Sequence, residues 1–372
     1  MKPLIKWTGG KYSEAKNFLH LVPKFDRYIE PFFGGGGVFF SLEPQVESFI
    51  NDKSIDLMSF YNLLKNKKFK NYLEEYASFW CLIGKVSKEK YKPIGEFYYL
   101  FKSNEISKDE LREKIDNFIN DKVSVYFDFN LNKSFFVYDG IIQIIKNCLV
   151  DKLNRIKNIE LKEEKVFSEE EMGQHVETAF KSGFYTHFRN ILNENQTKEK
   201  SKISEEKRIA NWYLIRELCY GAMFRFNENG EFNIPYGAIG YNKKDLMHKI
   251  QKIFSKDCEK LFAKTKAYNL DFEKFINKVS PNENDFMFVD PPYDSTFKKY
   301  DNNAFGRESH ERLASVLYST KCKWMLVIKN TEFIYGLYDK KGINIVSFDK
   351  KYMYNARGRN DRNTEHLIIK NY

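Results

Sequence analysis

Two groups of short apolar runs, one near each end of the chain, have the pattern of β-strands. The first group lies within residues 1–65, and the second lies in the last hundred residues. The strand-like runs are RYIEPFF (27–33), ESFIND (47–52), NDFMFVD (284–290), CKWMLVIKN (322–330), GINIVSFDK (342–350) and TEHLIIKN (364–371). Helical spacing occurs in residues 12–21, in SIDLMSFYNLLK (54–65) and in SHERLASVLYST (309–320). Strands and helices in alternation predict an α/β fold with a mainly parallel sheet covered on both faces.

The middle of the chain has a different pattern. Residues 66–180 are rich in Lys, Glu, Tyr and Phe, poor in Gly and Pro, and mostly helical in spacing. Residues 205–224 form another helical run and lead into RFNENGEFNIPYG (225–237), where Asn229-Gly230 predicts a β-hairpin. We therefore expect one α/β domain, residues 1–65 and 265–372, that is split by a large, mainly helical insertion at residues 66–264.

Composition narrows the class of protein. The 372 residues carry a formal net charge of +10 and 17% aromatic residues, which suffice for packed cores and for stacking surfaces. The positive charge favours a polyanionic partner such as nucleic acid, although a Lys-rich proteome would give the same excess. The five cysteines and six histidines are scattered, without the close pairs of a zinc site. With no apolar signal core and no apolar run of roughly 20 residues, we expect a cytoplasmic protein.

A glycine cluster follows the first strand-like run. YIEPFFGGGG (28–37) has the form acid-Pro-Phe-x-Gly-x-Gly, given by Glu30, Pro31, Phe32, Gly34 and Gly36. Glycines lack a Cβ and let a ligand approach the backbone closely, and N–H groups before a helix favour a polar or anionic group. The cluster therefore indicates a nucleoside cofactor, and a flexible turn is the simpler alternative.

Two further segments fit a nucleoside site. Asp52 ends the second strand-like run, where an acid accepts hydrogen bonds from ribose hydroxyls in open α/β sheets, although a helix N-cap would also explain it. The N-terminal KWTGGK (6–11) places Trp7 and Lys11 on either side of two glycines. Trp7 suits stacking on a ligand and Lys11 supplies a cation, whereas a glycine turn beside a core tryptophan is the structural alternative.

The segment FMFVDPPY (286–293) is either a strand that ends in a rigid turn or an active site at a strand end. Its last four residues are Asp290, Pro291, Pro292 and Tyr293. In the order KWTGGK, EPFFGGGG, Asn-Asp, insertion and DPPY, the chain resembles the Dam-like, D12 class DNA adenine-N6 methyltransferases with the α-group order of motifs. The resemblance covers roughly residues 1–65 and 183–372, and residues 66–180 match nothing in it.

The resemblance implies a Rossmann-like methyltransferase sheet that transfers a methyl group from S-adenosylmethionine to N6 of adenine in duplex DNA. The amino nitrogen of adenine is a poor nucleophile because its lone pair is delocalised into the ring. Asp290 and the carbonyl of Pro291, which the proline ring holds rigidly, would accept the two N–H groups and localise that lone pair. Tyr293 would stack on a base flipped out of the duplex. No metal is required, because positioning and electrostatics should supply most of the rate.

The resemblance also implies a cofactor pocket. It would be formed by Trp7, Lys11, Glu30, Phe32, Gly34, Gly36, Asp52 and Asp271. Lys11 would meet the methionine carboxylate, and Asp52 would hold the ribose hydroxyls. Asp271, in YNLDFEKF (268–275), would accept from the adenine amino group of the cofactor, and a helix cap is its structural alternative.

Residues 66–264 would then recognise the DNA target, with 183–264 as the part that resembles the family. Base contacts are expected from Arg225, Asn227, Asn233 and Tyr236 in or beside the hairpin. Phosphate contacts are expected from Arg189, Arg216 and Arg357, with a surface salt bridge as the alternative for each. The segment CYGAMFRFN departs from the Asn-Gly that often precedes the Arg-Phe-Asn element in compact relatives, so the target sequence stays open.

Three other interpretations are open at this point. A cytosine-N4 or RNA amino methyltransferase would use almost the same chemistry, but cytosine-N4 enzymes more often resemble Ser-Pro-Pro-Tyr, which Asp290 does not match. A non-catalytic DNA-binding relative should have lost Asp290 or the glycines. A nuclease fused at residues 66–180 would rest on Glu163-Glu164-Lys165 alone. A separate cognate restriction endonuclease is a candidate partner, and the resemblance suggests a prokaryotic or phage origin.

Overall fold

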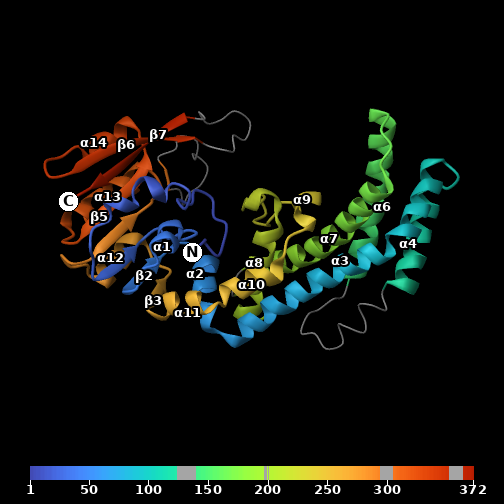
Figure 1. The fold of residues 1–372 in the computed structure, drawn as a ribbon, viewed down its shortest axis with the longest axis horizontal. Coiled ribbons are helices and arrows are strands. Elements are labelled where there is room, and N and C mark those ends of the chain that lie inside the picture. Colours follow the sequence, from blue (N-terminus) through green and yellow to red (C-terminus); the bar gives the residue numbers. More distant parts are fainter. Residues whose placement is uncertain (124–139, 197–198, 200, 294–304, 352–362) are drawn as a thin grey trace. The chain divides into compact units, whose positions relative to one another are not determined.

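The chain divides into two compact units, shown in Figure 1. The split unit comprises Met1–Lys65 and Ser255–Tyr372, and the inserted unit comprises Asn66–Phe254. The computed structural model describes residues 1–123, 140–196, 199, 201–293, 305–351 and 363–372. The second boundary lies before α11 (Lys256–Ala263) rather than after residue 264, because α11 packs beside strand β3 of the split unit.

A seven-stranded sheet forms the centre of the split unit. Its order is β3-β2-β1-β4-β5-β7-β6, and all neighbouring strands are parallel except that β7 is antiparallel to both β5 and β6. The six expected strands are present, whereas β3 was not expected, because its half-buried residues form no apolar run. The strands are β1 (Arg27–Glu30), β2 (Glu47–Asn51), β3 (Thr265–Tyr268), β4 (Phe286–Val289), β5 (Lys323–Lys329), β6 (Asn344–Lys351) and β7 (Asn363–Lys370).

The strand order reverses between β1 and β4. From β1 the chain proceeds outward to β2 and β3, and from β4 it proceeds to β5 on the other side. Ligands of open α/β sheets bind at the carboxyl ends of the strands that flank such a reversal. Glu30 is the last residue of β1 and Asp290 follows the last residue of β4, so the sheet brings both acids to this edge.

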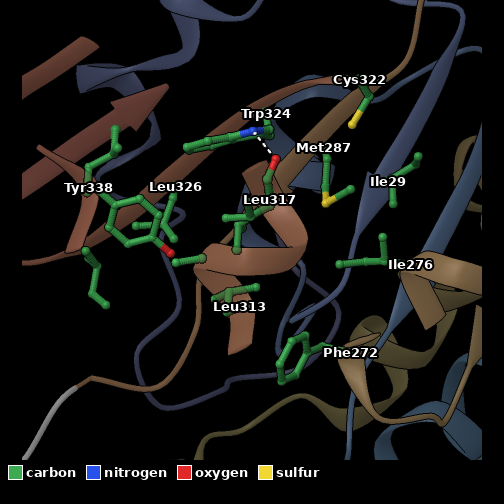
Figure 2. Packing of buried hydrophobic residues seen from close by; sticks show 14 of the residues in the cluster. Ile29, Phe272, Ile276, Met287, Leu313, Leu317, Cys322, Trp324, Leu326 and Tyr338 are labelled. Atoms are coloured by element: carbon green, nitrogen blue, oxygen red, sulfur yellow. Dashed lines mark hydrogen bonds between the residues drawn. The ribbon is translucent and has the colours of Figure 1, made fainter. Parts of the chain in front are cut away.

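One face of the sheet is covered by three helices, and Figure 2 shows the core between them. Alternate strand residues point to this face, among them Ile29 of β1 and Met287 of β4, and they pack with Leu313 and Leu317. The indole N–H of Trp324 donates to the Leu317 carbonyl at 3.0 Å, so the ring is buried without an unsatisfied donor. The helices are α12 (Phe272–Val279), α13 (Arg307–Ser319) and α14 (Glu332–Tyr338).

The opposite face carries an aromatic core. Phe18 stacks on Phe288 with ring centroids 5.6 Å apart, and Tyr28 packs on Phe39 at 5.9 Å. Residues 12–21, expected as one helix, form two 3₁₀ turns instead. The helical elements of the N-terminal segment are η1 (Ala15–Asn17), η2 (Leu19–Leu21), α1 (Gly37–Leu42), α2 (Ile55–Asn62) and η3 (Leu63–Lys65).

The inserted unit is mainly helical, as the sequence predicts. Its long helices pack through aromatic side chains, such as Phe79 with Phe184 and Tyr76 with Phe188, whose ring centroids are 5.2 and 4.9 Å apart. Capping boxes at Ser107 and Ser168 fix where α4 and α7 begin. Among the described helices of the chain, none is long and apolar enough to cross a membrane. The elements are α3 (Lys67–Lys102), α4 (Lys108–Lys122), α6 (Ile141–Glu163), α7 (Glu169–Glu194), α8 (Glu205–Leu218), η4 (Tyr220–Ala222), α9 (Ile239–Asn242) and α10 (Leu246–Ile253).

The predicted hairpin forms after α8. Its turn has the Gly230 amide bonded to the Asn227 carbonyl at 3.0 Å, with Gly230 at a φ of 77°. Two antiparallel bridges, Phe226 with Phe232 and Cys219 with Tyr236, replace the longer ladder of a regular hairpin. The segment 219–236 is therefore a closed loop with its turn at residues 227–230.

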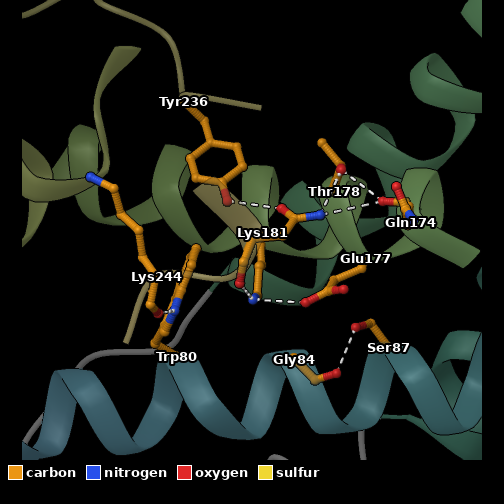
Figure 3. Close-up of polar contacts among 10 residues, drawn as sticks. Trp80, Gly84, Ser87, Gln174, Glu177, Thr178, Lys181, Tyr236 and Lys244 are labelled. Carbon is orange, nitrogen blue, oxygen red and sulfur yellow. Dashed lines mark hydrogen bonds and ion pairs between the residues drawn. The ribbon is translucent and has the colours of Figure 1, made fainter. Parts of the chain in front are cut away.

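A buried polar network holds the base of this hairpin, as Figure 3 shows. The Tyr236 hydroxyl donates to the side-chain oxygen of Asn242 at 2.9 Å, and the Asn242 amide donates to Thr178 at 2.9 Å. Lys181 donates to the Asn242 carbonyl and forms an ion pair with Glu177 at 2.8 Å. The network joins the end of the hairpin to α7, so buried polar groups are satisfied where the chain leaves the hairpin.

Candidate active site and DNA-binding hairpin

A cavity of about 530 Å³ opens at the carboxyl ends of β1 and β4. A volume of this size suits a cofactor or small ligand. The residues expected at the active site and in the cofactor pocket line it, with Gly36 as the exception. They are Trp7, Lys11, Glu30, Phe32, Gly34, Asp52, Asp271, Asp290, Pro291, Pro292 and Tyr293. The fold therefore brings segments from both halves of the split unit to one cavity.

Lys11 and the Asp-Pro-Pro-Tyr turn meet inside this cavity. The ammonium group of Lys11 forms an ion pair with Oδ1 of Asp290 at 2.5 Å and donates to the Tyr293 hydroxyl at 3.1 Å. Lys11 is 2% exposed, so its charge is buried beside a carboxylate that keeps some contact with solvent. Charge-assisted bonds of this kind hold side chains firmly. The ammonium thus contacts both the acid and the tyrosine, and the methionine carboxylate that the resemblance implies as its partner stays a prediction.

The glycine cluster makes room for the N-terminal segment. A Cβ on Gly34 would lie 2.9 Å from the Trp7 ring, and a Cβ on Gly37 would lie 2.6 Å from the backbone nitrogen of Tyr12. Gly34 also has a φ of 51°, which side chains rarely adopt. Close packing within the protein is therefore one reason for the glycines, and the Gly34 backbone still faces the cavity.

Glu30 lies buried at the end of β1. Its carboxylate accepts a hydrogen bond from the Tyr28 hydroxyl at 2.7 Å. Burial raises the pKa of Glu30 well above its ordinary value, the Tyr28 bond opposes this shift, and the nearby Asp290 and Asp52 carboxylates add to it. A cationic group in the cavity would favour the ionised form of Glu30.

Two neighbouring residues shape the floor of the cavity at the end of β2. Asp52 accepts from the Gly34 amide at 2.8 Å and from the Ser54 amide at 2.9 Å, and burial raises its pKa against these bonds. Asn51 donates to the carbonyls of Pro31 and Leu270, at 3.0 and 3.1 Å. The ends of β1, β2 and β3 are thereby tied together around the cavity.

Asp271 caps a helix and lies at the cavity, while its contact with the adenine of the cofactor stays a prediction. It caps α12 by accepting from the Glu273 amide at 3.0 Å, and it also lines the cavity. Arg312 donates to both of its carboxylate oxygens, at 2.9 and 3.0 Å. Arg312 itself lines the cavity and was not anticipated, because it lies in an ordinary amphipathic helix, α13, with no motif around it.

An aromatic wall completes the cavity. The ring of Phe32 packs edge-on against Phe305 at 5.4 Å and beside Phe272 at 5.5 Å. Phe272 follows Asp271 in the sequence, and that pairing is the signal that could have indicated it. Phe305 has no such signal, because it reaches the cavity from the residues just before α13.

The expected DNA-contacting residues fall into exposed and buried groups. Arg225 and Asn233 are exposed on the hairpin, where the Arg225 Nε donates to the Asn233 side chain at 3.2 Å. Asn227 is half-buried and stabilises the turn through bonds to the amides of residues 229 and 231. Tyr236 is 8% exposed and held by the network of Figure 3, which argues against direct contact with DNA.

The three predicted phosphate contacts also differ. Arg216 is 3% exposed, and its guanidinium lies over the rings of Phe224 at 4.4 Å and Trp212 at 5.6 Å, which likewise argues against a phosphate contact. Arg189 is half-buried on α7. Arg357 lies outside the described residues.

Exposed apolar side chains gather on the same hairpin segment. Tyr220, Met223 and Phe226 are each between 43% and 47% exposed. Single exposed apolar residues are ordinary, whereas three within seven residues beside an exposed arginine form a candidate interaction surface. These three side chains belong to no sequence motif, and only the tertiary structure shows that they are exposed.

The fold and the cavity together define a class of protein. A Rossmann-like sheet with a glycine turn and an Asp-Pro-Pro-Tyr turn at its strand reversal is the framework of a methyltransferase that acts on exocyclic amines. Among the described residues, no group of three or more His, Cys, Asp or Glu side chains lies close enough to hold a metal ion.

The family model for the D12 class N6 adenine-specific DNA methyltransferases matches residues 7–139 and 135–354. The chain belongs to this family, so it is an enzyme that methylates adenine in DNA at specific sites. The family match includes residues that the sequence resemblance left unplaced.

Two named relatives match over the full length. The chain is 26% identical over 378 residues to the Type II methyltransferase M.CviBI of Paramecium bursaria Chlorella virus NC1A, with 100% of both proteins covered. It is 27% identical over 396 residues to the Type II methyltransferase M.MjaIII of Methanocaldococcus jannaschii, covering 100% of this chain and 99% of that protein. A DNA adenine methylase of Vibrio cholerae is 34% identical over 93 residues, which cover 25% of this chain and 32% of that protein.

Proposed function

We propose that this chain transfers a methyl group from S-adenosylmethionine to N6 of an adenine that is flipped out of duplex DNA. One observation carries the proposal: Lys11, Asp290, Pro291 and Tyr293 converge on the cavity that the glycine turn and the acids of β1 and β2 also line. The amino group to be methylated and the methyl donor would meet at this point.

The cavity fits the cofactor chemically. Asp52 and Asp271 are hydrogen-bond acceptors for hydroxyl and amino groups, and Glu30 is a buried acid that a cationic ligand would favour in its ionised form. Phe32 supplies an apolar face beside them. When bound, S-adenosylmethionine supplies a methyl group on positively charged sulfur. These side chains bind and orient it, and the close-packed Gly34 turn lets it approach the backbone.

The Asp-Pro-Pro-Tyr turn would act on the adenine. Asp290 accepts one N–H of the exocyclic amine and the Pro291 carbonyl accepts the other, so that the nitrogen lone pair points at the methyl group. Tyr293 stacks on the base and offsets part of the cost of removing it from the helix. Lys11 acts as a positioning residue, because its two bonds fix Asp290 and Tyr293 relative to each other.

The inserted unit would select the target sequence through its hairpin. Arg225 is exposed beside the apolar side chains of Tyr220, Met223 and Phe226, so a charged donor and stacking groups lie on one segment. Because two relatives are Type II methyltransferases, we also propose that the modification protects the host DNA from a separate restriction endonuclease in the cytoplasm.

The test is to incubate the protein with duplex DNA and S-adenosylmethionine carrying a labelled methyl group. Mass spectrometry of the nucleosides should recover N6-methyldeoxyadenosine, and sequencing that detects modified bases should give one target site. Asp290→Ala should abolish transfer while calorimetry still detects cofactor binding. Recovery of N4-methylcytosine alone, or of methylated RNA alone, would overturn the proposal, and full activity of Asp290→Ala would remove this residue from the mechanism.

A further inference from the structure

Three cations on neighbouring helices of the inserted unit have no acidic partner among the residues that the structure describes. Lys152 and Arg155 lie on α6, and Arg189 lies on α7. Within the described parts of the chain, none of the three forms an ion pair or a side-chain hydrogen bond. The exposed acid Asp151 is their neighbour on α6, yet it pairs with none of them.

Other cations of the same unit are neutralised locally. Lys85 pairs with Glu89 on α3 at 3.9 Å, Lys165 pairs with Glu171 at 3.2 Å, and Lys181 pairs with Glu177 at 2.8 Å. Acids are thus available throughout this Lys- and Glu-rich unit. The three cations on α6 and α7 therefore form a local excess of positive charge, defined here as the α6–α7 cation track.

The track begins where the hairpin is anchored. Tyr185, Arg189 and Asn193 are spaced four residues apart, so they lie on one face of α7. Tyr185 donates to the Ile234 carbonyl at 2.7 Å, and Asn193 bonds both the amide and the carbonyl of Phe232, at 2.8 and 3.2 Å. Arg189 therefore lies between the two side chains that attach the hairpin to α7.

The track continues onto α6 through Cys148. The pKa of the Cys148 thiol is raised by burial and by Asp151, and the positive charges of Arg189 and Lys152 oppose this rise. The thiol is thus within electrostatic reach of a cation on each helix. Cys148, Lys152 and Arg155 follow one another by one helical turn, which places them along one side of α6. The cations thus run from the base of the hairpin along α6.

The closeness of these positive charges disfavours the protonated form of Lys152. Lys152 is half-buried, and both burial and the adjacent Arg155 lower its pKa. A bound anion would offset both effects, because an opposite charge nearby favours the protonated ammonium. From Cys148 to Arg155 the helix rises roughly 10 Å, which is about three base-pair steps of duplex DNA.

We propose that the α6–α7 cation track binds the phosphate backbone of duplex DNA beside the target site. The proposal rests on the proposed function, because it extends the DNA surface of the hairpin onto the helical extension at residues 66–180. Such contacts carry affinity and orientation rather than base selection. The extension would therefore lengthen the stretch of DNA that the protein holds.

The test measures how binding of a duplex depends on salt. Fluorescence anisotropy with a 30-base-pair duplex of random sequence, at several salt concentrations, gives the slope of log affinity against log salt. Each lost phosphate contact should reduce the magnitude of this slope by about 0.9. Lys152→Gln with Arg155→Gln should therefore reduce it by about 2, and Arg189→Gln by about 1. Lys85→Gln, which removes an exposed and already paired cation of α3, is the matched control and should change nothing.

The outcomes separate this inference from the proposed function. If the double variant keeps the wild-type slope while the wild type still methylates adenine, the track is not a DNA contact and the proposed function stands. If the slope falls as expected but no methyl transfer occurs with any variant, the track stands and the proposed function fails. Tighter binding of single-stranded RNA than of the duplex, with the same cations required, would also overturn the inference. Circular dichroism would show that the variants are folded, as expected for half-buried or exposed positions.

Discussion

The ammonium group of Lys11 lies 2.5 Å from Oδ1 of Asp290, although the two residues are 279 positions apart in the sequence. The same ammonium reaches the hydroxyl of Tyr293. One buried cation thereby links the N-terminal glycine segment to the turn that follows β4. This one side chain contacts both the acid and the aromatic ring that would hold adenine.

Replacing Lys11 with methionine should keep a side chain of similar length at this position but remove its positive charge. Asp290 and Tyr293 would lose the donor that fixes them, and misplacement by about 1 Å can lower a rate by about 10²-fold. We expect kcat to fall by about that factor, with a smaller change in the affinity for duplex DNA. Steady-state kinetics would measure this, with Lys16→Met, an exposed lysine of the same segment, as the control. An unchanged kcat would show that Lys11 does not position the site.

Glu30→Gln should raise thermal stability in a pH-dependent way. Because the pKa of Glu30 is raised in the folded protein, the unfolded chain releases this proton first as the pH rises. Wild-type stability therefore falls as the pH increases above the ordinary glutamate range, and glutamine, which cannot ionise, escapes this loss.

Thermal unfolding followed from pH 4 to pH 9 would test this expectation. At neutral pH the variant should have a higher Tm than the wild type, by about 2–4 °C for each kcal/mol gained in the free energy of unfolding. This difference in Tm should vanish near pH 4. Glu47→Gln, at an exposed position of β2, is the control. A constant difference between variant and wild type across the pH range would contradict the burial argument. The same Glu30 variant should bind S-adenosylmethionine more weakly.

Asp271→Ala should separate the cap from the cofactor contact. Loss of an N-cap side chain costs about 1 kcal/mol, and Ser255→Ala, which removes the cap of α11 in the same unit, should cost about the same. Only Asp271→Ala should also weaken cofactor binding in calorimetry, because only Asp271 lines the cavity. Equal cofactor affinity in the two variants would assign Asp271 to the cap alone.

Gly37→Ala should be strongly destabilising for a steric reason. Its new Cβ would come within 2.6 Å of the Tyr12 backbone nitrogen, a contact that requires the backbone to move. Overpacking of this kind should lower the free energy of unfolding by about 1–3 kcal/mol. Chemical denaturation would measure this loss. Gly336→Ala on α14, where no heavy atom lies within 4 Å, should be neutral or stabilising. Similar effects at both positions would show that the N-terminal segment does not pack on the glycine turn.

Arg225→Ala should change which sites are methylated. A lost arginine contact to a base relaxes selection by about 1–3 kcal/mol at one position of the target. Sequencing of modified bases should then show additional methylated sites, while calorimetry gives an unchanged cofactor affinity. Lys70→Ala, a paired and exposed lysine of α3, should preserve the wild-type pattern. An unaltered pattern in Arg225→Ala would place base recognition elsewhere on the hairpin.

Local features of the chain could be predicted from the sequence. Apolar alternation located β1, β2, β4, β5, β6 and β7, because strand and helix periods are properties of neighbouring residues. Asn229-Gly230 gave the hairpin turn for the same reason, since its backbone preference is local. The motifs around Gly34 and Asp290 also indicated the family, and both motifs line the cavity.

The tertiary structure alone decided which distant side chains meet. Arg216 and Tyr236 look like contact residues in the sequence, yet packing buries both, because burial depends on neighbours from α3, α7 and α8. Arg312 reaches Asp271 from a helix without a motif. The pairing of Lys11 with Asp290 cannot be predicted from either segment alone. The order of strands in the sheet brings the two residues together, and local sequence preferences do not encode that order.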